Sequence, residues 1–250
     1  MAMNPMEQFS IKPIVPLHIG HYDVSFTNQS LLMVLVVGAA ALFLTLAVKP
    51  GRLVPTRGQS MAEASYEFVA NMIHSSTGED GLKFFPFVFS LFMFVLLANF
   101  FGMVPGSFTI TSQIAVTFAL AALVILTVIV TGFARHGLGF LKLFVPHAPL
   151  PLLLLLVPIE VISFLTRPIS LSVRLFANML AGHTMLQVFA GFVIALGGAG
   201  GILSVLSIAP MLLIVAIMLL ELLVAFLQAY VFSILTCIYL NEALHLHDHH

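Results

Sequence analysis

Residues 167–183 read RPISLSVRLFANMLAGH, and this stretch places Arg174 inside an otherwise apolar part of the chain. An arginine at membrane depth costs roughly 3 to more than 10 kcal/mol. Its guanidinium stays charged, because its pKa lies above about 12. A fixed cation in such surroundings needs a carboxylate partner or a water-filled cavity, and within a membrane it indicates an ion or proton pathway.

The composition of the whole chain is that of a membrane protein. Of its 250 residues, 60% are hydrophobic and 8% are charged, whereas soluble domains carry about 25% charged residues. The fold class predicted from this composition is an all-α polytopic membrane protein. A net charge of −1 predicts no basic face for nucleic acid, and the single cysteine, Cys237, excludes an internal disulfide.

Apolar runs divide the chain, taken as a single membrane domain, into segments of different length. Three runs are about as long as a bilayer crossing requires: residues 31–48, 84–104 and 114–133. Residues 60–76 are too short and too polar to cross, so we expect a helix lying along the interface. A capping box at Ser60–Glu63 would begin that helix. Residues 1–30 are expected to form an external N-terminal segment without a signal peptide.

The last two apolar runs, residues 152–196 and 202–240, are longer than a single crossing needs. Straight helices of about 40 residues would each reach roughly 60 Å, whereas the hydrocarbon core is only about 30 Å thick. We therefore expect a long, strongly tilted helical hairpin that turns at the glycine-rich residues 197–201. A surface that follows a partner across the membrane plane would account for this length.

Basic residues on the short loops predict the orientation of the chain. They follow the first and third spans, at Lys49, Arg52, Arg57, Arg135 and Lys142. The loop at residues 105–111 and the glycine turn carry no charge. The positive-inside rule therefore predicts an external N-terminus and a cytoplasmic C-terminus.

A stripe of polar residues is predicted on the first helix of the hairpin. At about 100° per residue, its members fall within roughly 40° of Arg174 on the helix surface: Glu160, Ser163, Arg167, Ser170 and Asn178, with Arg174 itself. His183 points to the opposite side of the helix from Arg174, unless Gly182 permits a kink. The second helix carries Glu221, Gln228 and Glu242 on one face.

Residues at one level of an antiparallel hairpin have numbers whose sum is roughly constant. By this rule the level pairs are Arg174 with Gln228, Glu160 with Glu242, and His183 with Glu221. A titratable group is thus expected on each side of one fixed positive charge. This arrangement suits two proton paths separated by a barrier.

Simpler interpretations of the same residues stay open at this stage. Arg174 could form a structural ion pair with Glu160 or Glu221, and the serines could bond to carbonyls of their own helix. His183 could be a hydrogen bonder between helices, a role that we also expect for Asn99. Two other functional classes also remain: a secondary transporter or channel with an intramembrane arginine, and a haem- or quinone-binding respiratory subunit. The chain shows no second copy of the Arg174 segment, as transporters with internal repeats would.

RPISLSVRLFANMLAGH, together with Gln228 and the two long helices, resembles subunit a of F-type ATP synthases. The stretches EQFSIKPIVPL and FFPFVFSLFMFVLLANFFGMVPGSF are similar to its mitochondrial and alphaproteobacterial branch, and the resemblance covers nearly the whole chain. It implies that Arg174 is the stator arginine facing a rotating ring of c subunits, with Gln228 beside it. Asn178, His183 and Glu221 would then line the half-channel from the outside, and Glu160 the cytoplasmic one. Further polar lining is expected from Ser170, Arg167 and Glu242.

The resemblance also implies the partners and the location of the chain. The expected partners are the c-ring, b-type subunits of the peripheral stalk and the lipid bilayer. The expected location is the bacterial inner membrane, with the mitochondrial inner membrane as the alternative and the N-terminus on the periplasmic side. No cofactor or metal is expected. No nucleotide chemistry is expected either, because the chain has no phosphate-binding GxxxxGK[ST] loop.

Overall fold

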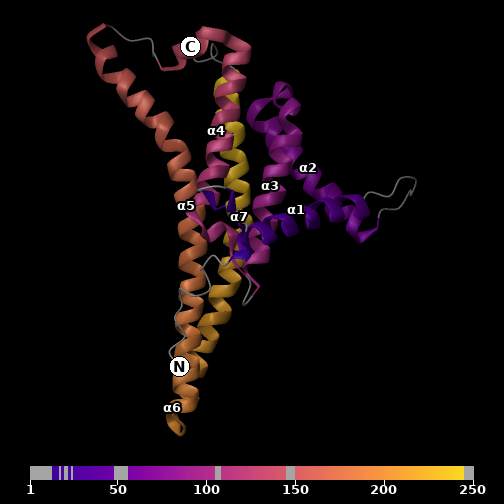
Figure 1. Cartoon of the computed structure of the whole chain (residues 1–250), viewed down its shortest axis with the longest axis vertical. Coiled ribbons are helices and arrows are strands. Elements are labelled where there is room, and N and C mark those ends of the chain that lie inside the picture. Colours follow the sequence, from indigo (N-terminus) through magenta and orange to yellow (C-terminus); the bar gives the residue numbers. More distant parts are fainter. Residues whose placement is uncertain are drawn as a thin grey trace. The chain divides into compact units, whose positions relative to one another are not determined.

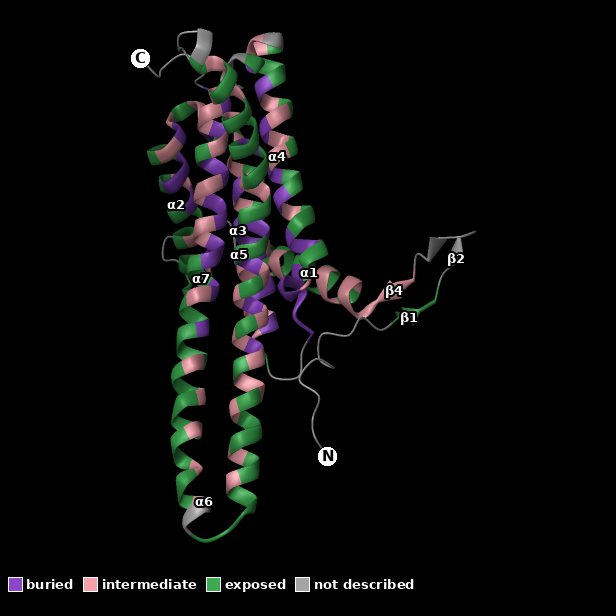
Figure 2. Ribbon diagram, turned by 90° about the vertical axis from the view of Figure 1, so that its left-hand side faces the viewer, coloured by how far each residue is buried: buried purple, intermediate pink, exposed green. Residues whose placement is uncertain are grey.

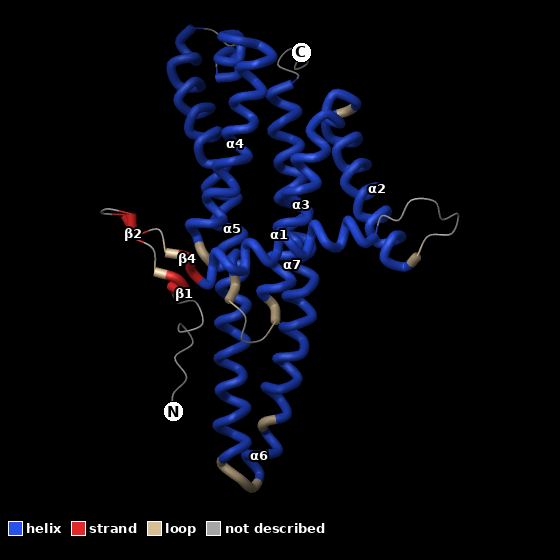
Figure 3. The backbone as a smooth tube through the Cα atoms, turned by 45° about the vertical axis from the view of Figure 1, so that its right-hand side comes forward, coloured by secondary structure: helices blue, strands red, loops and turns tan. Residues whose placement is uncertain are grey.

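The structure is a computed structural model of the chain, and it describes most of its length. The described residues are 13–16, 18–19, 22–23, 25–47, 56–104, 108–144 and 150–244. Helix is the main conformation, as Figure 3 shows. Two basic residues that support the predicted orientation, Lys49 and Arg52, lie outside the described residues, as does the histidine-rich tail at 245–250.

The helices follow the apolar runs of the sequence. In chain order they are α1 (Asn28–Ala47), α2 (Arg57–Thr77), the 3-10 helix η2 (Glu79–Phe84), α3 (Phe85–Gly102), the 3-10 helix η3 (Ile110–Ser112), α4 (Ile114–His136), the 3-10 helix η4 (Gly137–Phe144), α5 (Leu150–Gly198), α6 (Ile202–Leu206) and α7 (Ile208–Leu244). Within the described residues, five helices are long and apolar enough to cross a membrane. The predicted all-α polytopic membrane fold is therefore confirmed.

Short strands precede the first helix. They are β1 (Pro13–Val15), β2 (His18–Ile19), β3 (Tyr22–Asp23) and β4 (Phe26–Thr27). β1 pairs antiparallel with β4, and β2 pairs antiparallel with β3. No periodic pattern predicts these strands, because each is only two or three residues long.

Helix α2 begins earlier than its predicted capping box. Thr56 is the N-cap, and its side chain accepts a hydrogen bond from the backbone N–H of Gln59. Thr56–Gln59 has the same threonine-to-glutamine spacing as a capping box. The prediction of a cap at Ser60 was wrong, because Ser60 already lies within the first helical turn.

The chain divides into two compact units. The first contains residues 1–43, 93–113 and 175–229, and the second contains residues 44–92, 114–174 and 230–250. In the first unit, the later part of α5, α6 and the early part of α7 form a helical hairpin (Figure 1). Gly200 and Gly201 make its turn with φ of 71° and 62°, a conformation that glycine adopts at little cost.

The interior of the first unit contains both apolar and polar side chains. Leu175 and Met179 of α5 and Ala225 of α7 are fully buried. Asn99 of α3 is fully buried as well, and its Nδ2 donates to the carbonyl oxygen of Ala225 at 3.2 Å. This contact confirms the predicted role of Asn99 as a link between helices. Figure 2 shows that the α5 and α7 segments next to α6 are mostly exposed.

The second unit is held together by contacts among α2, α4, η4 and α7. The Thr77 hydroxyl of α2 donates to the carbonyl oxygen of Cys237 at 3.3 Å. Phe140 of η4 is 1% exposed and packs over Gly132 of α4. A Cβ added at Gly132 would lie 2.3 Å from the Phe140 ring. The glycine is therefore needed for the close approach of η4 to α4.

We predict that Gly132→Ala destabilises the protein, because the new methyl group overlaps the buried Phe140 ring. Overpacking of this kind costs about 1–3 kcal/mol. Gly38→Ala in α1 is the matched control, since a Cβ there meets nothing within 4 Å. The aggregation temperatures of both variants are measured in mild detergent. The aggregation temperature of Gly38→Ala should equal or exceed that of the wild type. Adding Phe140→Leu to Gly132→Ala should partly restore the aggregation temperature. Equal aggregation temperatures for Gly132→Ala and the wild type would contradict this packing account.

Candidate functional site

A histidine and a carboxylate meet inside the first unit. His183 of α5 and Glu221 of α7 are 6% and 4% exposed, and His183 Nε2 lies 3.5 Å from Glu221 Oε1. The structure thus brings together the two residues that the hairpin rule puts at one level. A buried carboxylate is costly unless it is protonated or paired with a cation. At 3.5 Å the two groups are close enough for an ion pair, whereas Glu221 Oε1 has no hydrogen-bond partner among the described residues.

Gly182 makes room for this carboxylate. A Cβ added at Gly182 would lie 2.7 Å from Glu221 Oε1. Helix α5 continues through Gly182, and the absence of a side chain there allows the close approach of Glu221. His183 is buried whereas Arg174 is exposed, as expected for residues on opposite sides of one helix.

A third residue contacts the pair from the loop between α3 and α4. Thr109 is fully buried, and its Oγ1 lies 3.2 Å from His183 Nε2. Sequence analysis missed Thr109, because a contact across 74 positions leaves no periodic pattern. The one available signal was the run of hydroxyl residues between two apolar spans, at Thr109, Thr111 and Ser112.

Two further predicted site residues belong to the first unit. Gln228 of α7 is 6% exposed, and its Nε2 has no hydrogen-bond partner among the described residues. Asn178 of α5 is half-buried. A buried amide donor without a partner costs about 1–3 kcal/mol. Gln228 is therefore suited to a water molecule or to a group on another chain.

Arg174 belongs to the second unit and is exposed. No hydrogen bond or ion pair joins it to the described residues of that unit. Glu160 is half-buried and forms no ion pair with Arg174. The structural Arg174–Glu160 pair considered from the sequence is therefore not formed. Ser170 is exposed too, so polar groups of the α5 stripe are available to partners outside the chain.

The other arginine of the stripe has its partners within the second unit. Arg167 forms an ion pair with Glu242, and its Cζ lies 5.0 Å from the centre of the Tyr239 ring and 5.7 Å from that of Phe164. Aromatic faces attract a guanidinium. Glu242 thus pairs with Arg167, and no hydrogen bond joins it to Glu160, its predicted level partner.

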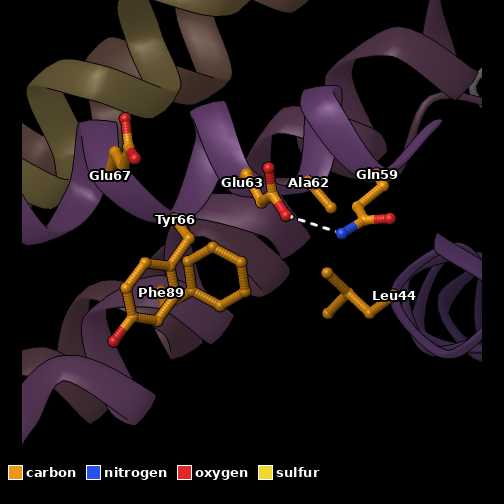
Figure 4. Close-up of a pocket in the computed structure, with 7 residues that line it drawn as sticks. All are labelled: Leu44, Gln59, Ala62, Glu63, Tyr66, Glu67 and Phe89. Carbon is orange, nitrogen blue, oxygen red and sulfur yellow. Dashed lines mark hydrogen bonds between the residues drawn. The ribbon is translucent and has the colours of Figure 1, made fainter. Parts of the chain in front are cut away.

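The second unit also contains a cavity of about 350 Å³ near the start of α2. Figure 4 shows its lining from α1, α2 and α3, which consists of Leu44, Gln59, Ala62, Glu63, Tyr66, Glu67 and Phe89. Gln59 Nε2 donates to Glu63 Oε1 at 2.8 Å across this lining. None of the predicted site residues lies there. Among the described residues, no cluster of three or more His, Cys, Asp or Glu side chains could hold a metal ion.

Comparison with known proteins identifies the family. A family model described as ATP synthase A chain matches residues 30–241. The chain is 61% identical to "ATP synthase subunit a" of Mesorhizobium japonicum over 97% of both chains. It is 62% identical to the protein of that name from Allorhizobium ampelinum over 98% of both chains, and 60% identical to that from Sinorhizobium medicae over the full length of both. The chain therefore belongs to the ATP synthase A chain family, as a multi-pass subunit of the membrane sector.

Proposed function

We propose that this subunit provides two offset proton half-channels, separated by Arg174, that load and unload the carboxylates of a rotating c-ring. The observation that supports this most is the contrast between Arg174 and Arg167 in one helix. Arg167 is neutralised by Glu242 and lies near two aromatic rings, whereas Arg174 is exposed and lacks an ion pair among the described residues of its unit. The Arg174 guanidinium is therefore available to a carboxylate of another chain.

Arg174 acts by electrostatics in this proposal. A charged carboxylate facing lipid is costly, so each ring carboxylate must be protonated before it rotates away. Beside Arg174 the ionised form is favoured, because a nearby cation stabilises a carboxylate. The fixed positive charge also opposes direct passage of a proton between the half-channels. Each charge that crosses the membrane gains about 2.3 kcal/mol per 100 mV, which drives the rotation.

The buried pair His183 and Glu221 serves the half-channel from the periplasmic side. An imidazole titrates near neutral pH, with an unperturbed pKa of about 6.5. Placed 3.5 Å from a carboxylate oxygen, it can pass a proton on without leaving an isolated charge. Asn178 and Gln228 supply further polar groups on this side. The buried Gln228 donor, which lacks a partner among the described residues, is suited to a water molecule in the path.

Glu160 and Ser170 line the cytoplasmic half-channel, and Arg167 with Glu242 forms its polar boundary. In this orientation the N-terminus lies on the periplasmic side of the bacterial inner membrane. The c-ring lies against the exposed polar stripe of α5, and b-type stalk subunits hold the chain still. This chain performs no nucleotide chemistry, and ATP forms in the catalytic head of the complex.

We predict that Arg174→Ala abolishes ATP synthesis driven by an imposed proton gradient, while membrane insertion and co-purification with the c-ring persist. Arg174→Lys should also fail, because a lysine enclosed between this chain and the c-ring can lose its proton. The matched control is Arg135→Ala, which removes an exposed ion pair with Asp80, because exposed pairs of this kind contribute little to stability. The assay is ATP synthesis by the complex in vesicles. Normal coupled synthesis with Arg174→Lys would contradict the barrier role.

A second prediction concerns the space for Glu221. Gly182→Ala should reduce passive proton flux, on the order of tenfold, because the Glu221 carboxylate must move away from His183. Gly191→Ala, on the same helix, is the control, since a Cβ there meets nothing within 4 Å. Flux is measured through membranes stripped of the catalytic head, at equal amounts of assembled complex. Glu221→Asp, with its shorter side chain, should partly restore flux in the Gly182→Ala background. Equal flux in both glycine variants would exclude the proposed path through Glu221.

A further inference from the structure

The loop between α3 and α4 reaches the interior of the first unit. Residues 108–112 of this loop are all buried. Thr109 Oγ1 lies 3.2 Å from His183 Nε2 and 3.4 Å from the carbonyl oxygen of Gly102, to which it can donate. A single hydroxyl thus has a proton acceptor on one side and a titratable ring nitrogen on the other.

The hydroxyl can serve His183 whether or not Nε2 carries a proton. A threonine hydroxyl has one hydrogen to donate and two lone pairs that accept. When Nε2 is protonated, its single hydrogen is shared between Thr109 Oγ1 at 3.2 Å and Glu221 Oε1 at 3.5 Å, and the Thr109 hydroxyl donates to the Gly102 carbonyl oxygen. When Nε2 is bare, the hydroxyl rotates and donates to it. An ionised Glu221 can only accept, so its carboxylate pairs only with the protonated Nε2.

The methyl group of Thr109 fixes the direction of this hydroxyl. A Cβ added at Gly102 would lie 2.7 Å from Thr109 Cγ2, so the methyl group packs directly over the glycine at the end of α3. This packing limits rotation about the Cα–Cβ bond and keeps Oγ1 beside His183. The two groups on Cβ therefore have separable roles: the methyl packs, and the hydroxyl contacts the imidazole.

We propose that Thr109 is a positioning residue of the proton path, and that its hydroxyl keeps the His183 imidazole aligned with Glu221 through both protonation states of Nε2. This inference rests on the proposed role of the His183–Glu221 pair in proton transfer. It adds a part of the site that lies outside the helical hairpin. Loss of the hydroxyl leaves bare Nε2 without this donor at the moment when it must accept a proton.

Two substitutions separate the hydroxyl from the methyl group. Thr109→Val keeps the shape and removes the hydroxyl, whereas Thr109→Ser keeps the hydroxyl and removes the methyl. Passive proton flux through membranes stripped of the catalytic head should fall about fivefold in Thr109→Val, the worth of one neutral hydrogen bond. Thr109→Ser should lose no more than about twofold, because its hydroxyl still reaches the same partners although the methyl group no longer limits its rotation. Each flux is compared at equal amounts of assembled complex.

Two controls make the result specific. Thr111→Val alters the same loop at a fully buried threonine whose hydroxyl has no partner among the described residues, and it should conduct like the wild type. In a His183→Gln background, Thr109→Val should cause no further loss, because residues that act as one unit are not additive.

The outcomes divide clearly. Wild-type flux in Thr109→Val with reduced flux in Thr109→Ser would mean that Thr109 only packs, and would overturn the inference. Equal loss in both variants would overturn it as well, as would further loss in the His183→Gln background. If His183→Gln itself conducts like the wild type, the proposed path through His183 fails, and the inference falls with it.

Discussion

The need to keep a carboxylate inside an apolar helical interior shapes the first unit. Glu221 is 4% exposed and lies 3.5 Å from His183. Gly182 leaves room for its oxygen, and Thr109 approaches the imidazole from a buried loop. An isolated buried charge costs far more than a protonated or paired one. In the proposed proton path, the protonation of this pair and its local structure are therefore coupled.

The two arginines of the α5 stripe have opposite surroundings within the second unit. Arg167 is held by Glu242 and by the faces of Tyr239 and Phe164. Breaking such a pair would leave an uncompensated charge, so we regard it as fixed. Arg174, seven residues later on α5, is exposed and has no such partners in its unit. Of the two, only Arg174 leaves a cation available to a group on a partner that approaches and then moves away.

Much of the fold and of the candidate site could be predicted from the sequence, because the length of apolar runs and helical spacing are local properties. They predict the long helices α5 and α7, and the constant-sum rule predicts the meeting of His183 and Glu221. Contacts that depend on side-chain reach or on loops could not be predicted in the same way. Arg167 is long enough to reach Glu242 away from its own level, and Thr109 meets His183 only through the folded loop. The cap at Thr56 was missed because the polar Ser60–Glu63 sequence fits the same motif.

We propose that His183 and Glu221 form one path for the proton. Exchanging the two residues tests this proposal, and the measurement is passive proton flux in membranes stripped of the catalytic head. His183→Glu alone leaves two acids facing each other, and Glu221→His alone leaves two histidines. The double exchange restores one acid and one histidine at the same level, and it should recover more flux than either single exchange. Additive losses, with no recovery in the double exchange, would contradict a shared path.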